Sequence, residues 1–236
     1  MKKILIALCG FVILLAALAY STYYKKNQGI LGESEVFQGI DVSHYQDNIN
    51  WKKVKDSGVI FAYIKVSEGI HSLDRKFSQN WHETAKMQIL RGGYHFFEPD
   101  EDAEKQARLF LNKIQKNGCC NGTLPPALDV EVIREVDKAK LEQGIRTWLR
   151  IVEDEIHCKP IIYTDSGFWN QYLGGKFTDY KLWLAEYSNK VTLPIGWKRH
   201  TFWQFASDKK ITGILGNVDK NKFVGTKAEF KHLICP

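Results

Sequence analysis

The stretch Ala127-Leu128-Asp129-Val130-Glu131 places two acids in a short apolar run that follows two prolines. Such a run predicts a buried strand, in which successive side chains point to opposite faces. Asp129 and Glu131 then share one face, about 7 Å apart along the strand. Because carboxylates on an inward face are costly to bury, we interpret this strand end as the centre of an active site.

Two neighbouring carboxyl groups have a definite chemical use. Their mutual repulsion, together with partial burial, would raise the pKa of one towards neutrality. One protonated acid beside one anion is the division of labour that glycoside cleavage requires. The alternative to a catalytic pair is a solvated acid pair at a strand end, and the choice between the two depends on the surrounding sequence.

Outward from this pair, short apolar runs alternate with longer amphipathic stretches. Strands are predicted at 39–42, 59–66, 90–97, 128–131, 160–164, 182–185, 201–205 and around Val218, and helices at 51–57, 77–87, 101–117 and 137–156. This alternation predicts a parallel α/β architecture, and eight short strands predict a barrel. Because helices become sparse in the last third, we expect a single-domain, irregular β/α (TIM-like) barrel.

The N-terminus predicts export. Met1-Lys2-Lys3 precedes an apolar run from Ile4 to Ala19, which ends in a small-x-small pattern. Residues 1–20 are therefore interpreted as a signal peptide or a membrane anchor, 21–36 as a linker and 37–236 as the catalytic domain. The domain would be secreted, periplasmic or tethered to the membrane, facing away from the cytoplasm. Cleavage and anchoring both stay open.

Four cysteines follow the apolar run: Cys119, Cys120, Cys158 and Cys235. An even number suits disulfides in an exported chain. Adjacent cysteines strain a bridge, so Cys119 and Cys120 are not expected to pair with each other, and either is a candidate partner of Cys158 or Cys235. The sequence lacks a CxxC pair and any histidine spacing typical of zinc, so neither a metal nor an organic cofactor is expected.

Composition restricts the partners. The 236 residues carry a formal net charge of +6 and are 44% hydrophobic and 13% aromatic. The charge favours anionic partners such as nucleic acid, an acidic membrane or a cell-wall polymer. Because the basic residues are scattered and form no nucleic-acid motif, nucleic acid is not expected as a partner. We expect a monomer.

Further acids and aromatic residues occur at the predicted strand ends. Asp41 lies in the first strand, Glu68 follows the second, and Asp219 lies near the last. The accompanying candidates for sugar contacts are Tyr94, Tyr163, Trp183, Trp203 and Gln204. Taken singly, the acids read as turn or cap residues and the aromatics as core, but together they are typical of a carbohydrate cleft.

The region from about Phe37 to Phe223 resembles glycoside hydrolase family 25, the lysozymes that act as N-acetylmuramidases. Eight segments in family order carry the resemblance: 39–43 with Gln46, 64–69, 93–96, 128–131, 162–164, 182–185, 202–205 and 216–221. The resemblance implies an irregular barrel with an acidic, elongated groove. Ser67 departs from it, since threonine is common there, and the 119–122 loop and the cysteine-bearing C-terminus look particular to this chain.

The resemblance also implies roles for individual residues. Glu131 matches the general acid, Asp129 the second central carboxylate, Asp41 and Asp219 the flanking acids, and Tyr94 a groove tyrosine. The implied reaction is hydrolysis of the β-1,4 bond between N-acetylmuramic acid and N-acetylglucosamine in peptidoglycan. Glu131 would protonate the leaving oxygen, while Asp129 would stabilise charge or orient the substrate's acetamide.

Two alternatives are a chitinase-like hydrolase of another N-acetylglucosamine polymer and a cell-wall binding protein without turnover. The contexts of Asp41 and Asp219 argue against the first, and retention of all four acids argues against the second. Use of the barrel as a docking scaffold alongside catalysis stays open.

Overall fold

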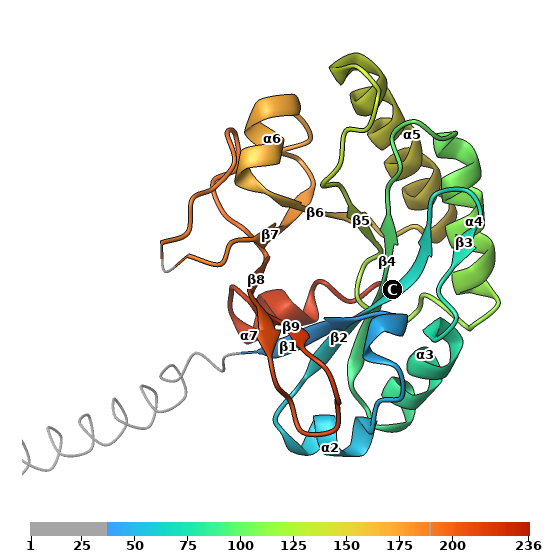
Figure 1. Cartoon of the computed structure of the whole chain (residues 1–236), viewed down its shortest axis with the longest axis vertical. Coiled ribbons are helices and arrows are strands. Elements are labelled where there is room, and N and C mark those ends of the chain that lie inside the picture. The colour runs from blue at the N-terminus through green and yellow to red at the C-terminus, as the bar shows by residue number, and fades with distance from the viewer. Residues whose placement is uncertain (1–36, 189) are drawn as a thin grey trace, which may run out of the picture. The chain divides into compact units, whose positions relative to one another are not determined.

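The computed structural model describes residues 37–188 and 190–236, which form a closed barrel (Figure 1). The signal or anchor segment predicted for residues 1–20 and the linker predicted for residues 21–36 lie outside this described part. Within it, no helix combines the length and apolarity that crossing a membrane requires.

Nine strands form one sheet, and eight of them close into the barrel. The strands are β1 (Gln38–Val42), β2 (Phe61–Glu68), β3 (Ser72–Leu73), β4 (Leu90–Phe96), β5 (Ala127–Asp129), β6 (Ile161–Asp165), β7 (Lys181–Ala185), β8 (Phe202–Lys209) and β9 (Val218–Phe223). Their order is β1-β9-β8-β7-β6-β5-β4-β2-β3, and pairing of β1 with β2 completes the ring. Only β9 runs antiparallel to its barrel neighbours, while β3 folds back on β2 as a hairpin. The predicted irregular β/α barrel is confirmed.

Helices cover the barrel unevenly. They are a 3-10 turn, η1 (His44–Gln46), followed by α2 (Trp51–Asp56), α3 (Phe77–Lys86), α4 (Ala103–Gln115), α5 (Lys138–Ile156), α6 (Ser166–Tyr172) and α7 (Lys227–Lys231). Figure 1 shows α3, α4 and α5 outside β2, β4 and β5. Asp102 and Asp137 cap α4 and α5 by accepting hydrogen bonds from backbone N–H groups of the first turn. The four predicted helices are confirmed, whereas α6 and α7 were not predicted.

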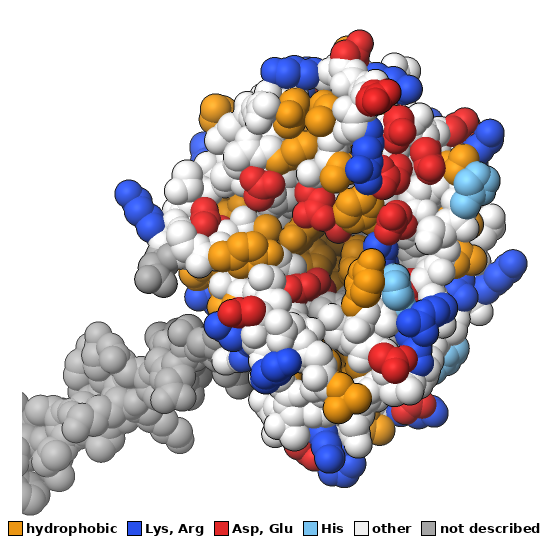
Figure 2. Space-filling view, viewed as in Figure 1, with side chains coloured by type: hydrophobic (Ala, Val, Ile, Leu, Met, Phe, Trp, Pro, Cys, Tyr) orange, Lys and Arg blue, Asp and Glu red, His pale blue; other side chains and the backbone are white. Residues whose placement is uncertain are grey.

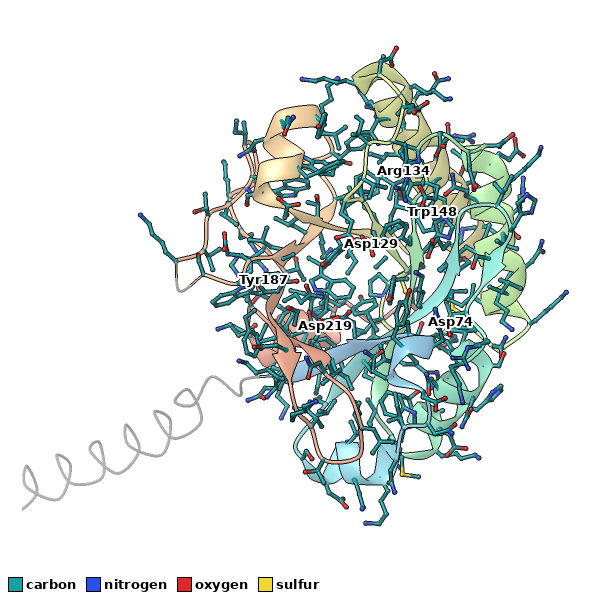
Figure 3. The ribbon with its side chains drawn as sticks, viewed as in Figure 1. Asp74, Asp129, Arg134, Trp148, Tyr187 and Asp219 are labelled. Carbon is teal, nitrogen blue, oxygen red and sulfur yellow. A yellow bond between two sulfur atoms is a disulfide. The ribbon has the colours of Figure 1, made fainter. Side chains whose placement is uncertain are left out.

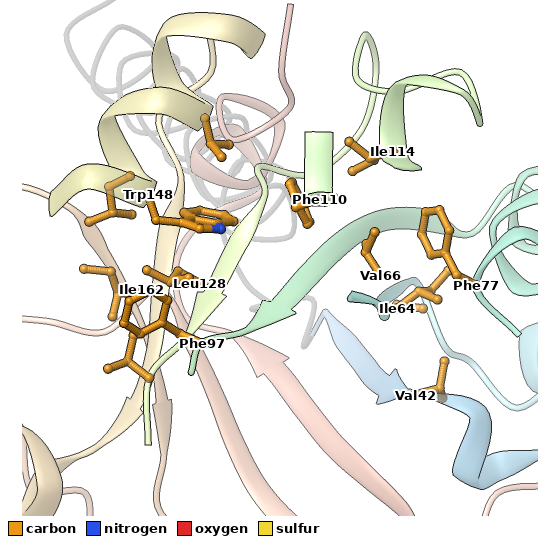
Figure 4. Close-up of a cluster of buried hydrophobic side chains, with 14 of the residues drawn as sticks. Val42, Ile64, Val66, Phe77, Phe97, Phe110, Ile114, Leu128, Trp148 and Ile162 are labelled. Atoms are coloured by element: carbon orange, nitrogen blue, oxygen red, sulfur yellow. The ribbon is translucent and has the colours of Figure 1, made fainter. Parts of the chain in front are cut away.

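The outward side chains of the strands pack against these helices. Val66 of β2 belongs to one buried cluster with Phe110 and Ile114 of α4, and Leu128 of β5 belongs to it with Trp148 of α5 (Figure 4). The helical spacing predicted for 137–156 is also seen, because Leu141, Ile145, Trp148, Leu149 and Val152 are all fully buried. Burying each such side chain stabilises the fold by about 1.5–3 kcal/mol.

The barrel interior changes character along its axis. Near the N-terminal ends of the parallel strands it is filled by aromatic rings, among them Phe61, Phe202 and Phe223. This layer needs a glycine at position 39, because a Cβ there would lie 2.3 Å from the Phe61 ring. Towards the other end the same strands carry polar side chains. The inward positions therefore build a closed apolar floor beneath an open polar end.

The expectation for the pairing of the cysteines is wrong. Cys158 pairs with Cys235, with Cα atoms 5.5 Å apart, a normal separation for a disulfide. The remaining two described cysteines, Cys119 and Cys120, pair with each other. Because Cys158 and Cys235 are bonded to each other, neither is available as the partner expected for Cys119 or Cys120.

The Cys158–Cys235 bridge joins the segment between α5 and β6 to the C-terminal segment across 77 positions of sequence. The double variant Cys158→Ala/Cys235→Ala should lose about 2–5 kcal/mol of unfolding free energy, because the unfolded chain is no longer constrained. Chemical denaturation measures this loss. Cys119→Ala/Cys120→Ala is the control and should lose much less, since that bridge closes almost no loop; equal losses would contradict the argument.

Candidate active site

A cavity of about 470 Å³ opens at the C-terminal ends of the parallel strands. Its walls carry Asp41, Val42, Ser43, Tyr45, Gln46, Lys65, Glu68, Tyr94, Phe96, Asp129, Glu131, Tyr163, Trp183, Tyr187, Gln204 and Asp219. Figure 2 shows acidic side chains gathered around this hollow. The structure therefore brings together all four predicted catalytic acids.

Asp129 and Glu131 enter the cavity from the end of β5. The strand ends at Asp129, two residues earlier than predicted, yet the alternation continues. Val130 turns outward into the core and donates its N–H to the carbonyl of Tyr163, so Glu131 faces inward again. Asp129 is 8% exposed and its Oδ1 has no protein partner, whereas Glu131 is exposed at the mouth.

Burial raises the pKa of Asp129 well above its ordinary value, and the negative charge of Glu131 raises it further. Burial also raises the pKa of Glu131, assisted by the charge of Asp165. The ammonium group of Lys65 opposes both shifts. The two carboxyls titrate as a pair that retains a proton at higher pH than isolated acids do.

Asp41 and Asp219 form a second acid pair, made by the register of the sheet. They lie opposite each other on the antiparallel strands β1 and β9, where facing side chains are in contact. Burial and the charge of Asp41 raise the pKa of Asp219 to about 8. The hydrogen bond between the two carboxyl groups raises it further, because such a bond requires a proton that the two groups share.

A buried chain of hydrogen bonds holds Asp41 in place. Its Oδ2 accepts from Gln204 Nε2 at 2.9 Å and from Asn221 Nδ2 at 2.6 Å. Asn221 in turn accepts from Trp183 Nε1 at 2.7 Å. The hydroxyl of Tyr163 donates to Gln204 Oε1 at 2.9 Å. Four neighbouring strands, β6 to β9, therefore fix one carboxylate of β1.

The predicted sugar contacts separate into three kinds. Tyr94 and Glu68 line the cavity. Tyr163, Trp183 and Gln204 also line it, but they are only 8%, 2% and 3% exposed, so they form its floor. Trp203 lies elsewhere, because strand alternation turns Phe202 and Gln204 inward and Trp203 outward. There Lys222 Nζ lies 3.9 Å from the centre of its ring.

Several cavity residues were missed in the sequence. Tyr45, in η1, and Tyr187, in the loop after β7, stand at the rim, 79% and 56% exposed, and neither segment carries a strand period. Figure 3 shows Tyr187 across the barrel mouth from Asp129, with Asp219 between β9 and the cavity. Lys65, which lines the cavity, and Asn221, which donates to Asp41, lay in segments already noted, and two-residue alternation from Asp219 would have found Asn221.

The arrangement can donate and accept protons beside an apolar floor, which suits acid–base cleavage of a polar polymer. In the described part of the chain, no three His, Cys, Asp or Glu side chains are placed to hold a metal ion.

The raised pKa of Asp219 makes stability depend on pH. Between about pH 4 and pH 8 the folded protein holds a proton at Asp219 that the unfolded chain releases, so this group's stabilisation is lost as pH rises through that window. Asp219→Asn should therefore melt above the wild type at pH 8 and close to it at pH 4. Thermal denaturation across this range measures the difference; Asp208→Asn, at an exposed acid, should show no such trend. Parallel curves for wild type and Asp219→Asn would contradict the shared proton.

Comparisons of the sequence and of the structure with known proteins point to the same protein family. The profile of the family described as Glycosyl hydrolases family 25 matches residues 40–214. Lysozyme M1 of Streptomyces globisporus is 35% identical over 205 residues, which cover 81% of this chain and 69% of that protein. The uncharacterized protein YegX of Escherichia coli K12 is 36% identical over 208 residues, covering 85% of this chain and 74% of YegX.

Among solved structures, the bacterial lysozyme of Streptomyces coelicolor superposes with a TM-score of 0.79 at 31% identity. The match covers 86% of this chain and 98% of the lysozyme. The chain therefore belongs to glycosyl hydrolase family 25 and is a glycosidase.

Proposed function

We propose that the protein is a lysozyme that hydrolyses the β-1,4 bond between N-acetylmuramic acid and N-acetylglucosamine in peptidoglycan, with Glu131 as general acid. The observation that carries the proposal is the Asp129–Glu131 pair, which faces the cavity and has raised pKa values. The similarity to proteins named lysozymes supports the choice of polymer.

The position of each carboxyl group suggests its role. Glu131, at the exposed mouth, can reach a glycosidic oxygen and give it a proton as the bond to the sugar carbon breaks. For this donation the proton of the pair has to be on Glu131 and Asp129 has to be ionised, and the positive charge that develops on the carbon as the bond breaks favours that ionised Asp129. Water attacks the carbon and returns a proton to Glu131.

Asp129 has a free acceptor for the substrate. Its buried Oδ1 lacks a protein donor, and an unpaired buried oxygen is costly. The N–H of a substrate acetamide would satisfy it and would turn the acetamide oxygen towards the reacting carbon. Direct stabilisation of the developing charge by Asp129 uses the same position, and both routes are compatible with Glu131 as the acid.

The remaining cavity residues would hold the polymer. Tyr94 and Glu68 provide polar atoms beside the reacting bond, and Tyr163, Trp183 and Gln204 act mainly by holding Asp41. Tyr45 and Tyr187 offer exposed rings on which sugar faces can stack. Export through residues 1–20, by cleavage or as a tether, would bring this cavity to its substrate, with 37–236 as the catalytic domain.

Glu131→Gln should lower turnover of purified peptidoglycan by at least about a thousandfold, because the amide keeps the shape of the acid but cannot donate its proton. Mass spectrometry of the reduced products identifies the bond that is cut. The wild type should release fragments with a new muramic acid reducing end, and the variant should melt at a similar temperature.

Glu186→Gln is a matched control, because Glu186 is an acid that does not line the cavity, and it should retain wild-type turnover. Wild-type turnover in Glu131→Gln would remove Glu131 as the acid. Cleavage of chitin without cleavage of peptidoglycan would instead favour the chitinase-like alternative, and binding without cleavage of either would favour a wall-binding protein.

A further inference from the structure

Strand β2 is irregular where it passes the cavity. Lys65 lies opposite Tyr94 of β4, but the next paired residues are Ser67 and His95, so Val66 and Ser67 together face one position. This is the arrangement of a β-bulge, which rotates the residues that follow it. In a regular strand, Ser67 would point inward with Lys65, and Glu68 would point outward.

The bulge reverses that order. Val66 packs into the outer core, and Ser67 Oγ also lies on the outer side, against the buried ring of His95. Glu68 is therefore turned to the side of Lys65, and both line the cavity. Their side chains form an ion pair across three positions, which ordinary strand alternation would prevent.

A buried chain of three side chains holds the bulge. Ser67 Oγ lies 2.9 Å from His95 Nδ1, and His95 Nε2 lies 2.9 Å from Gln106 Oε1 on α4. All three side chains have no exposed surface. The ring of His95 also stacks on Trp148 of α5, which is labelled in Figure 3.

The direction of each hydrogen bond follows from the backbone. Gln106 Nε2 donates to the carbonyl of Glu98, and Gln106 Oε1 accepts the N–H of Glu98. Because Oε1 only accepts, His95 Nε2 must carry the proton, so Nδ1 accepts from the hydroxyl of Ser67. Burial lowers the pKa of His95 to about 4, so the ring stays neutral at neutral pH. Only a hydroxyl or another donor at position 67 completes the chain.

Both ends of this chain reach the substrate side. Glu68 lines the central cavity and two grooves that continue from it, of about 340 and 230 Å³. Glu98, at the other end, lines the larger groove and binds Arg134 through two hydrogen bonds. The buried network thus contacts the backbone segments that carry Glu68 and Glu98, and both of these residues line the larger groove beside the cavity.

We propose that Ser67, His95 and Gln106 are positioning residues that turn Glu68 into the cavity, where it pairs with Lys65. The inference rests on the proposed function, because its effect is expected in hydrolysis. Lys65 is the only lysine or arginine among the residues lining the cavity. The charged groups around the Lys65–Glu68 pair are Asp41 on β1, Asp219 on β9, Asp129 and Glu131 at the end of β5, His44, Asp74 and Arg75 beside the smaller groove, and His71, Glu98, Asp100, Glu101 and Arg134 beside the larger one.

A double-mutant cycle in the full chain tests the proposal. Ser67→Ala and Glu68→Gln should each lower kcat/KM on soluble peptidoglycan fragments, by about tenfold. If Ser67 acts by placing Glu68, the double variant should fall within about twofold of either single variant. Ser67→Ala should also shift the acidic limb of the pH–rate profile in the same direction as Glu68→Gln.

Thr84→Ala is the matched control, because it also removes a fully buried hydroxyl, one bonded to carbonyls within α3. It should lower the melting temperature but leave the pH–rate profile unchanged. If Ser67→Ala does not fold, His95→Phe takes its place, since it keeps a ring against Trp148 and breaks the same link.

Losses that multiply in the double variant, or an unshifted pH–rate profile in Ser67→Ala, would overturn the positioning role. Glu131→Gln is measured alongside. Its inactivity together with multiplying losses would reject only the inference, whereas its full activity would reject the proposed function itself.

Discussion

The antiparallel pairing of β9 with β1 is the constraint on which the rest of the structure depends. It joins the two ends of the described barrel, and without it the sheet would have two open edges. Its register also sets Asp41 opposite Asp219 and brings Asn221 to within 2.6 Å of Asp41. The same pairing therefore closes the barrel and assembles the Asp41–Asp219 pair, since a shift of one residue in the register would turn Asp219 and Asn221 outward.

Holding several acids in one cavity requires compensation for their lost hydration. The fold supplies it unequally. Asp41 receives two side-chain donors and shares a proton with Asp219, whereas Asp129 keeps an unpaired oxygen and the strongly raised pKa that accompanies it. The side-chain donors are thus concentrated on Asp41, and Asp129 keeps an oxygen that a substrate donor could satisfy. A fully satisfied Asp129 would be more stable and chemically less useful.

The barrel, four of its helices and the acid cluster could be predicted because each depends on local periodicity or on a strand-end motif. Alternation through Asp129, Val130 and Glu131 is one example, and it survives although the strand ends early. What could not be predicted depends on contacts between distant segments. The direction of Trp203 follows from strand alternation once Gln204 is placed, but the exposure of Tyr187 depends on how a loop crosses the mouth. The Cys158–Cys235 pairing depends on where the fold places the C-terminal segment, and the spacing of the cysteines along the sequence does not predict it.

Charge on this molecule acts at two ranges. The net charge of +6 favours approach to anionic polymers, while the cavity that would cut such a polymer is strongly acidic. The surface cations do not neutralise the acids of the cavity, because water and salt screen their charge over about 8 Å. Among the residues that line the cavity, Lys65 is the only lysine or arginine. Lys65 lowers the pKa of Asp129 and of Glu131 against the larger effect of burial, so it weakens the hold of the pair on its proton. The bulge that turns Glu68 towards Lys65 therefore places an ion pair beside the acids, where it acts on their pKa values more directly than the overall charge can.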